Sequence, residues 1–286
     1  MQHTITLSQA IARNPQLRLA APVDLQLNDG EQLAIVGPNG AGKSLLVDLL
    51  TGKLPLLQGF PTYDFRPSAS SMAYDNIKYI AFRDTYGSAD ANYYYQQRWN
   101  QTEQDDVPLV RELLGGHTND EVRNRLFRLF GLEPLLDKKI ILLSSGELRK
   151  FQLTKALLTS PRILIMDNPF IGLDATTRQM LSQLMEELTQ QFPLQIVLVL
   201  SMMEDVPTFI THVIPVDSMR VGEKMERSSY LKQFAVEDAS RRESDEVSYA
   251  VTNSLVAAVP YQGIHFRGSE VVKLNKVSIR YDDRTI

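Results

Sequence analysis

Short apolar runs alternate with longer amphipathic segments along most of this chain. Strands buried on both faces are predicted at four runs rich in aliphatic residues, 32–36, 77–82, 162–166 and 195–200. Helices are predicted at the segments 45–50, 110–136, 147–158 and 176–189. Because strands and helices alternate, the sequence predicts an α/β fold. Its core sheet is expected to be mostly parallel and to carry helices on both faces.

A glycine-rich loop joins the first of these strands to the first helix. Its residues are Gly37, Pro38, Asn39, Gly40, Ala41, Gly42, Lys43 and Ser44, and Leu45 follows. The loop fits the pattern G-x-x-x-x-G-K-[ST] in full, in the strand–loop–helix context that a phosphate-binding loop requires. Backbone N–H groups would surround the phosphates of a nucleotide, Lys43 would reach the β- and γ-phosphates, and Ser44 would bind Mg²⁺. The alternative is a glycine turn that precedes a helix by chance.

A second anion-binding element is predicted at the start of the helix 147–158. Leu143 is followed there by Ser144, Ser145, Gly146 and Glu147. Small hydroxyl side chains and a glycine at a helix N-terminus can bind an anion. The alternative is a capping box, since Ser144 and Glu147 are three residues apart. The phosphate loop upstream and the carboxylate downstream favour the functional interpretation.

The strand 162–166 is followed by Asp167 and Asn168. A carboxylate at the end of such a strand is predicted to bind the Mg²⁺ of a nucleotide. The next position is where an ATPase of this kind would carry a glutamate that handles the attacking water. Asn168 is an amide, which can orient water but cannot take its proton. The sequence therefore indicates nucleotide binding more clearly than nucleotide hydrolysis.

These motifs, in this order, resemble the ATP-binding cassette (ABC) family. Residues 143–174, LSSGELRKFQLTKALLTSPRILIMDNPFIGLD, look like its signature, Walker B and D-loop in register, and the resemblance covers about residues 5–235. The segments GELRK, YQQR and PFIGLD look most like those of the ModF-type subfamily of tandem cassettes, which are named for molybdate transport. The resemblance implies a P-loop NTPase fold with an antiparallel β-subdomain and a helical signature subdomain.

The same resemblance implies a head-to-tail dimer of cassettes that holds two ATP molecules and Mg²⁺ between them. Residues 37–45 would bind ATP, Ser44 and Asp167 would hold Mg²⁺, and Ser144, Ser145, Gly146 and Glu147 would complete the partner's site. The partner would be a second cassette, in the same longer chain or in a homodimer. A membrane permease subunit is a further expected partner.

Several positions depart from the family pattern. Asn168 stands at the glutamate position, and Ser201 or Met202 stands where a histidine near the γ-phosphate is expected. His212 lies too far along the chain to replace it and is expected to be a surface residue. An engineered trap is an alternative explanation of Asn168, but glutamine is the usual choice there. The combined losses favour a naturally degenerate site.

Two further departures concern the base and the loop after the strand 77–82. An internal comparison that sets Leu274 on Leu7 places Asn14 opposite Tyr281, so the first copy lacks the aromatic residue that would stack on adenine. Arg83 stands where a glutamine is expected, and Gln96 or Gln97 could serve if the surface loop 92–101 is enlarged.

A short internal sequence repeat also suggests how the chain is divided into domains. Residues 272–281 resemble residues 4–14, after a segment rich in charge and serine. We expect a first cassette at 1–235, a linker at 236–268, and the beginning of a second cassette at 269–286. This division predicts that the chain is the N-terminal half of a tandem protein.

Composition narrows the functional classes. The formal net charge of −4 and the absence of cysteine give no signal for wrapping nucleic acid, for disulfides or for cysteine-ligated metals. Three arginines, at 123, 125 and 128, alternate with apolar residues and indicate an amphipathic helix rather than a nucleic-acid patch. No apolar run reaches the roughly 18 residues that a membrane span needs. We expect a cytoplasmic protein, with a peripheral position at the inner face of the membrane as a possibility.

Three hypotheses of function follow. The first is one half of a tandem cassette ATPase that binds ATP and turns it over slowly. The second is a non-transport cassette protein acting on ribosomes or nucleic acid, which would predict a basic linker. The segment 237–246 instead has five acidic residues against two arginines. The third is a nucleotide sensor without hydrolysis, which needs a second cassette that is degenerate as well.

Overall fold

The computed structural model describes residues 2–82, 107–115, 120–201, 206–234, 280–281 and 284–285. The chain divides into two compact units, Met1–Leu231 and Lys232–Ile286. The described part of the second unit includes two short antiparallel strands, β12 (Arg280–Tyr281) and β13 (Arg284–Thr285). The elements that form the candidate site all belong to the first unit.

The core sheet of the first unit has the strand order β10-β9-β3-β8-β7-β6, and β11 also pairs with β9. The strands are β3 (Leu33–Val36), β6 (Ile77–Ala81), β7 (Ile163–Asp167), β8 (Gln195–Leu200), β9 (His212–Asp217), β10 (Arg220–Val221) and β11 (Met225–Glu226). Five of them, β6, β7, β8, β3 and β9, pair in parallel, whereas β10 and β11 are antiparallel to β9. The predicted mostly parallel sheet is confirmed.

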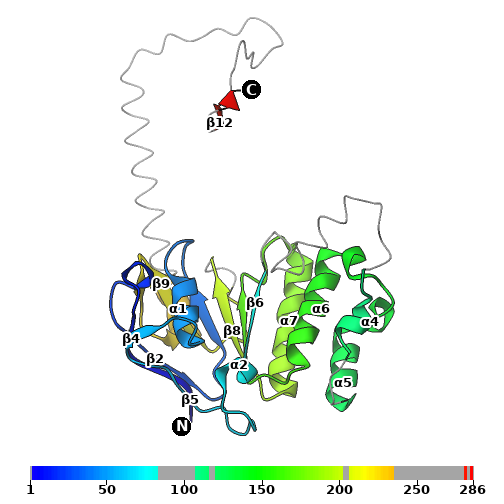
Figure 1. Ribbon diagram of the computed structural model, residues 1–286, viewed down its shortest axis with the longest axis horizontal. Coiled ribbons are helices and arrows are strands. Elements are labelled where there is room, and N and C mark those ends of the chain that lie inside the picture. The colour runs from blue at the N-terminus through cyan, green and yellow to red at the C-terminus, as the bar shows by residue number, and fades with distance from the viewer. Residues whose placement is uncertain are drawn as a thin grey trace, which may run out of the picture. The chain divides into compact units, whose positions relative to one another are not determined.

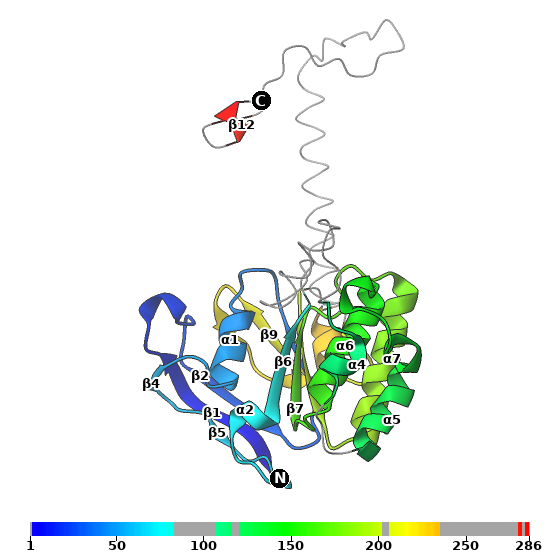
Figure 2. The same cartoon turned by 45° about the vertical axis from the view of Figure 1, so that its right-hand side comes forward.

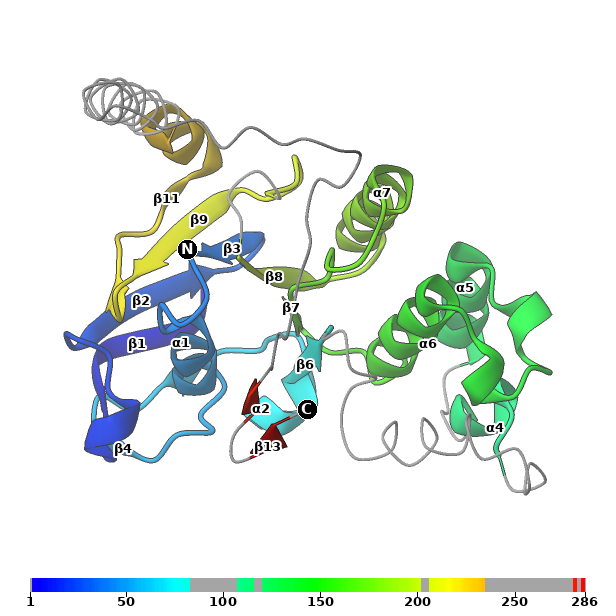
Figure 3. The same ribbon diagram turned by 90° about the horizontal axis from the view of Figure 1, so that it is seen from above.

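A second sheet is antiparallel throughout. Its long strand β1 (His3–Ala12) pairs with β2 (Val23–Asn28), β4 (Leu56–Gln58) and β5 (Thr62–Tyr63). A short 3₁₀ helix, Pro15–Leu17, lies between β1 and β2 in the sequence. The sheet lies beside α1 (Lys43–Leu50), as Figures 1 and 3 show. This confirms the expected antiparallel subdomain.

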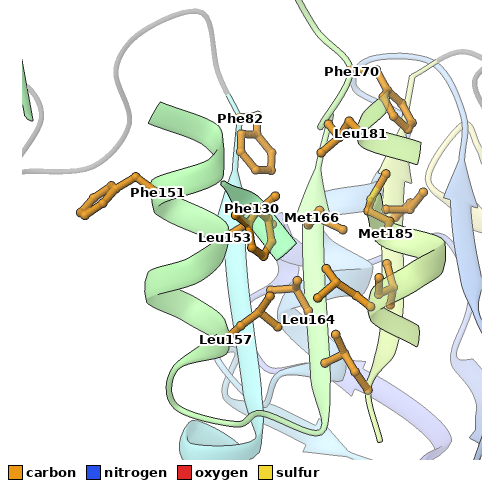
Figure 4. Packing of buried hydrophobic residues seen from close by; sticks show 14 of the residues in the cluster. Phe82, Phe130, Phe151, Leu153, Leu157, Leu164, Met166, Phe170, Leu181 and Met185 are labelled. Atoms are coloured by element: carbon orange, nitrogen blue, oxygen red, sulfur yellow. The ribbon is translucent and has the colours of Figure 1, made fainter. Parts of the chain in front are cut away.

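The core sheet is buried on both faces. Ile163 and Ile165 pack into the cluster that includes α1 and the antiparallel sheet, whereas Leu164 and Met166 pack into the cluster with α6 (Ser145–Leu157) and α7 (Ala175–Gln191). Figure 4 shows part of this second cluster, with Leu153, Leu157 and Met185 turned from the two helices toward the strands. An apolar side chain is therefore needed at every position of the run, because successive residues of a strand point to opposite faces.

The prediction of one helix over 110–136 is wrong. The described residues form α4 (Val110–Leu113), α5 (Asp120–Phe130) and a 3₁₀ turn, Glu133–Leu135. Two glycines follow these helices directly or nearly so, Gly115 after α4 and Gly131 after α5. Gly131 has a φ of 59°, the left-handed conformation that commonly ends a helix. Figure 2 shows α4 and α5 grouped beside α6, in keeping with a helical subdomain around the signature segment.

Two buried residues of α5 explain its amphipathic pattern. Leu126 and Phe130 are buried in the core, whereas Arg125 is exposed and donates a hydrogen bond from Nε to Gln191 Oε1 at 3.1 Å. The arginines of this segment therefore lie on the polar face of a helix, as predicted. No helix within the described ranges is long and apolar enough to cross a membrane.

Several predictions concern residues outside the described ranges. These are the loop 92–101, Arg83, Gln96, Gln97, Met202 and the linker 236–268. The proposed start of a second cassette at 269–286 is described only at its two short strands. The domain boundaries therefore stay predictions.

Candidate functional site

Three parallel strands bring the candidate residues to one edge of the core sheet. In the register of these strands, Val36 of β3 lies opposite Leu200 of β8, and Asp167 of β7 lies opposite Val199. The residues that directly follow β3 and β7 are hydrogen-bonded to the C-terminal end of β8. Gly37 N donates to Leu200 O at 3.2 Å, and Asn168 N donates to Val199 O at 2.8 Å. Because β8 lies between β3 and β7, Ser201, directly after β8, lies between the loops that follow the other two strands.

The phosphate loop connects β3 to α1 as predicted. Gly42 is the N-cap of α1 and has a φ of 107°, which favours glycine strongly. The helix begins at Lys43, so its first N–H groups lack partners within the helix and can bind an anion. Ser44 is exposed and Leu45 is half-buried on the first turn. The loop thus has the backbone arrangement of an anion site.

Lys43 is directed into this loop. The residue is only 7% exposed, and its Nζ donates to Gly37 O at 2.6 Å and to Pro38 O at 2.9 Å. Burial lowers the pKa of Lys43, while the negative charge of Asp167 acts in the opposite direction. An ammonium group held by two carbonyl oxygens can exchange them for phosphate oxygens without a large movement of the backbone.

Both carboxylate oxygens of Asp167 accept hydrogen bonds from neutral groups. Tyr79 of β6 donates its hydroxyl to Asp167 Oδ2 at 2.8 Å, and Asn168 Nδ2 donates to Asp167 Oδ1 at 3.1 Å. The ring of Tyr79 in turn lies 4.7 Å from Lys53 Nζ, a cation–π contact. The carboxylate is therefore held in position before any metal ion binds.

Asn168 and Ser201 are brought together, as the family pattern predicts for the residues at these positions. Ser201 Oγ lies 2.9 Å from Asn168 Oδ1 and 3.0 Å from Asn39 Oδ1 in the phosphate loop. Asn168 has a φ of 50°, a left-handed conformation that asparagine adopts more readily than most other residues. Neither Asn168 nor Ser201 is a group that takes a proton from water near neutral pH.

The signature residues form the N-terminus of α6. Ser144 is its N-cap, Glu147 N donates to Ser144 Oγ at 3.3 Å, and Ser144 N donates to Glu147 Oε2 at 2.8 Å. The capping box that was the alternative interpretation is thus present. Ser145 is the first residue of the helix, and a Cβ added at Gly146 would meet no atom within 4 Å. The approach to Gly146 is open.

A hydrogen bond from Lys138 Nζ to Glu147 Oε1, at 2.8 Å, is the main cause that lowers the pKa of Glu147. A bond from the backbone N–H of Ser144 adds to the effect. In the described part of the chain, no hydrogen bond or ion pair joins the signature residues 144–147 to the phosphate loop. The two motifs are separate sites within this chain.

Asn14 stands where an aromatic residue would stack on adenine, and His212 was considered as a replacement for the missing histidine. Both have other contacts in the structure. Asn14 is exposed and caps the 3₁₀ helix by accepting from Gln16 N at 3.0 Å. His212 begins β9, where its Nε2 lies 3.6 Å from Glu31 Oε1. In a parallel sheet, the start of a strand is at the edge opposite to the phosphate loop. His212 is half-buried rather than fully exposed, and it does not approach the site.

Tyr79 was not recognised from the sequence. Its position was nevertheless accessible, because Ala81 pairs with Asp167 and Tyr79 lies two residues earlier on the same face of β6. The sequence alone did not provide this register. Leu19 and Met219 were missed in the same way, and both pack so closely on Gly42 that a Cβ there would lie 2.8 Å from Leu19 Cδ2 and 3.3 Å from Met219 Sδ.

The oxygen donors at the site fit Mg²⁺. Within the described residues no cluster of three or more histidine, cysteine or acidic side chains is arranged to hold a metal ion. Mg²⁺ is commonly bound by one or two protein oxygens together with phosphates and water. The hydroxyl of Ser44 and the carboxylate of Asp167 are donors of this kind.

Comparison with known proteins identifies the family. A family model described as ABC transporter matches residues 20–171, more than half of the chain. The chain belongs to this family. The ABC transporter ATP-binding protein ModF of Escherichia coli (strain K12) is 30% identical over 231 residues, 78% of this chain and 44% of ModF. The chain therefore spans less than half the length of this ABC relative.

Two further relatives are matched over most of their own length. The taurine import ATP-binding protein TauB of Escherichia coli (strain K12) is 26% identical over 227 residues, 77% of this chain and 82% of TauB. CbiO1 of Clostridium perfringens, part of the ABC transporter complex CbiONQ, has a TM-score of 0.64 at 19% identity. Their alignment covers 88% of this chain and 100% of CbiO1. The structural likeness confirms the fold of an ABC ATPase domain.

Proposed function

We propose that this chain is an ATP-binding half of a tandem ABC protein, in which it binds Mg-ATP firmly and cleaves it slowly. The observation that carries the proposal is the environment of Asn168. Its amide donates to Asp167 and lies against Ser201, at the place where a general base would be needed. Losing a general base typically lowers a rate by about 10²–10⁴-fold.

The binding half of the proposal rests on the phosphate loop. Lys43 and the first N–H groups of α1 would hold the phosphates, while Ser44 and Asp167 would hold Mg²⁺. When bound, Mg²⁺ would neutralise charge on the β- and γ-phosphates. The side chains of this chain would orient the nucleotide, but none of them would activate the attacking water.

The partner is proposed to be a second cassette. Ser144, Gly146 and Glu147 lie apart from the phosphate loop, so they are available to complete a nucleotide site on another cassette. The 44% coverage of ModF is consistent with a tandem arrangement, in which the other half supplies that cassette. Hydrolysis would then occur at the second half's site. A membrane permease is a further proposed partner, with the cassettes at the cytoplasmic face.

Equilibrium binding and turnover measurements on the 286-residue chain test this proposal. We expect Mg-ATP to bind and to be cleaved slowly, and we expect Asn168→Glu to raise the cleavage rate by up to about 10². Asn168→Gln is the matched control, because it has the length of glutamate but remains an amide. A wild-type rate equal to or above that of Asn168→Glu would overturn the degenerate site.

The alternative of a cassette protein acting on ribosomes or nucleic acid is favoured by no interaction of the described residues. Two arginines of α5 contact neighbouring side chains, Arg123 with Asp120 at 2.8 Å and Arg125 with Gln191. Co-purification of the full tandem protein with ribosomes, rather than with a permease, would support that alternative. A non-hydrolysing sensor is distinguished by the absence of turnover in the full tandem protein.

A further inference from the structure

Ser201 lies between two side-chain amides that belong to different loops. Its Oγ is 3.0 Å from Asn39 Oδ1 in the phosphate loop and 2.9 Å from Asn168 Oδ1 after β7. A serine hydroxyl has a single proton, so it donates to one amide and must accept from the other. Only two directions of the hydrogen bonds are therefore consistent with both contacts.

The carboxylate of Asp167 selects one of these directions. Asn168 Nδ2 donates to Asp167 Oδ1 at 3.1 Å. If this amide were reversed, its oxygen would face an ionised carboxylate oxygen, and both atoms are acceptors. Asn168 therefore presents its oxygen to Ser201, which donates to it. The hydroxyl of Ser201 then accepts from the Asn39 amide, which presents nitrogen after a half-turn about its last bond.

We propose that Asn39, Ser201, Asn168 and Asp167 form one directed chain of hydrogen bonds that links the phosphate loop to the carboxylate of β7. Each donor in such a chain polarises the next one. Asn168 is a positioning residue in this chain. The amide of Asn168 accepts from Ser201 and donates to Asp167 at the same time, whereas an ionised glutamate could only accept, so Asn168 has a structural role beyond the absence of a general base.

The chain predicts a coupling between two ligands of the proposed site. Phosphate would bind at the loop that contains Asn39, and Mg²⁺ would bind at Asp167. Because both ends belong to one bonded chain, each ligand should strengthen the binding of the other. This consequence rests on the proposed function, whereas the hydrogen-bond chain itself is a property of the nucleotide-free protein.

The first test measures coupling between Asn39 and Asn168, which would communicate through Ser201. Asn39→Ala, Asn168→Gly and the double variant are prepared with Ser201 and again with Ser201→Ala. Glycine adopts a φ of 50° without strain, so Asn168→Gly removes the amide without straining the backbone. Denaturant unfolding of the nucleotide-free chain gives the equilibrium constant for every variant.

We expect the two substitutions to be coupled by about threefold to tenfold in the unfolding constant when Ser201 is present. With Ser201→Ala the coupling should fall below about 1.5-fold, within the usual error of such cycles. Additive effects in the presence of Ser201 would overturn the chain. An equal coupling without Ser201 would overturn it as well, because the hydroxyl would then not be the link.

The second test measures how far Mg²⁺ strengthens ATP binding. We expect this enhancement to fall by about fivefold or more in Ser201→Ala and to stay within about twofold of wild type in Ser201→Thr, which keeps the hydroxyl. Ser228→Ala, which removes an exposed hydroxyl far along the sequence, is the control and should change nothing. An unchanged enhancement in Ser201→Ala would overturn the coupling of the two ligands.

The two tests separate this inference from the proposed function. Coupling through Ser201 in a protein that fails to bind ATP would support the chain and reject the proposed function. Binding of ATP with slow turnover, together with additive effects at Asn39 and Asn168, would reject the chain and leave the proposed function intact.

Discussion

Gly37 lies directly against the backbone of Val216, so that a Cβ on this glycine would lie 1.8 Å from the Val216 carbonyl oxygen. Gly37 is the first residue of the phosphate loop, and Val216 belongs to β9, the strand beside β3. The contact therefore fixes where the loop leaves the sheet. Only a residue without a side chain permits this approach.

Gly37→Ala is expected to lower the free energy of unfolding by about 3 kcal/mol or more, because the loop or β9 must move. Denaturant unfolding measures the effect. Gly146→Ala is the matched control, since its added Cβ meets no atom within 4 Å and the residue lies in a helix. This control should leave stability unchanged or raise it by up to about 1 kcal/mol. Equal losses in the two variants would contradict the role of the Gly37 contact.

Lys43→Met is expected to weaken ATP binding by about 10- to 100-fold, because a charged hydrogen bond to phosphate contributes about 1.5–3 kcal/mol. Methionine keeps most of the buried length of the lysine side chain. Isothermal titration of ATP into the full chain measures the change. Lys155→Met, at an exposed position of α6, should bind ATP as the wild type does. A similar loss in both variants would argue against a phosphate contact by Lys43.

Glu147 is expected to make stability depend on pH at the acid end. Its pKa is lowered from the ordinary value of 4.5 in the folded state, with the bond from Lys138 as the first cause. The contribution of this carboxylate to stability is therefore fully present above a pH of about 4.5, and it is lost as the pH falls through the folded-state pKa. Near neutral pH, the free energy of unfolding of the wild type should exceed that of Glu147→Gln by about 0.5 kcal/mol, as is typical of partly exposed ion pairs.

Unfolding of both proteins across a range of about pH 3–7, which brackets the ordinary glutamate pKa of 4.5, tests this expectation. The difference between wild type and Glu147→Gln should shrink toward the acid end. A difference that is constant with pH would show that the carboxylate charge of Glu147 does not contribute.

Tyr79→Phe is expected to destabilise the nucleotide-free chain by about 1 kcal/mol, because Asp167 Oδ2 loses a hydrogen-bond donor. Phenylalanine keeps the ring that contacts Lys53. The effect should be smaller in an Asp167→Asn background, which removes the charged acceptor. Chemical unfolding of the four proteins gives this comparison, and equal effects in both backgrounds would contradict a bond that matters for stability.

Much of the architecture could be predicted from the sequence because it depends on local patterns. The run Ile163–Asp167 is apolar on both faces, so its burial could be inferred, while the Mg²⁺-binding role of its terminal carboxylate stays a prediction. The loop before α1 carries its own motif. The break between α4 and α5 was missed because the helical periodicity on both sides was given more weight than the segment 115–120, which has two glycines and no large apolar residue.

The contacts within the site could be predicted only in part. The motifs placed Asp167, Asn168 and Ser201 near one another, but not the bond from Tyr79 or the contact of Ser201 with Asn39. These depend on the register between β6 and β7 and on β8 lying between β3 and β7. Strand order and register are set by packing between segments far apart in the sequence, which a local pattern does not encode.

The left-handed backbone of Asn168 has a consequence for how this site can evolve. A glutamate at a φ of 50° costs more than an asparagine does, by an amount on the order of 1 kcal/mol, and it would bring a second negative charge beside Asp167. It would also give up the donated bond to Asp167. In the site as proposed, a change to glutamate that gains cleavage would therefore lose stability in the same step, so that evolution of a hydrolytic site here would need a stabilising change elsewhere in the chain.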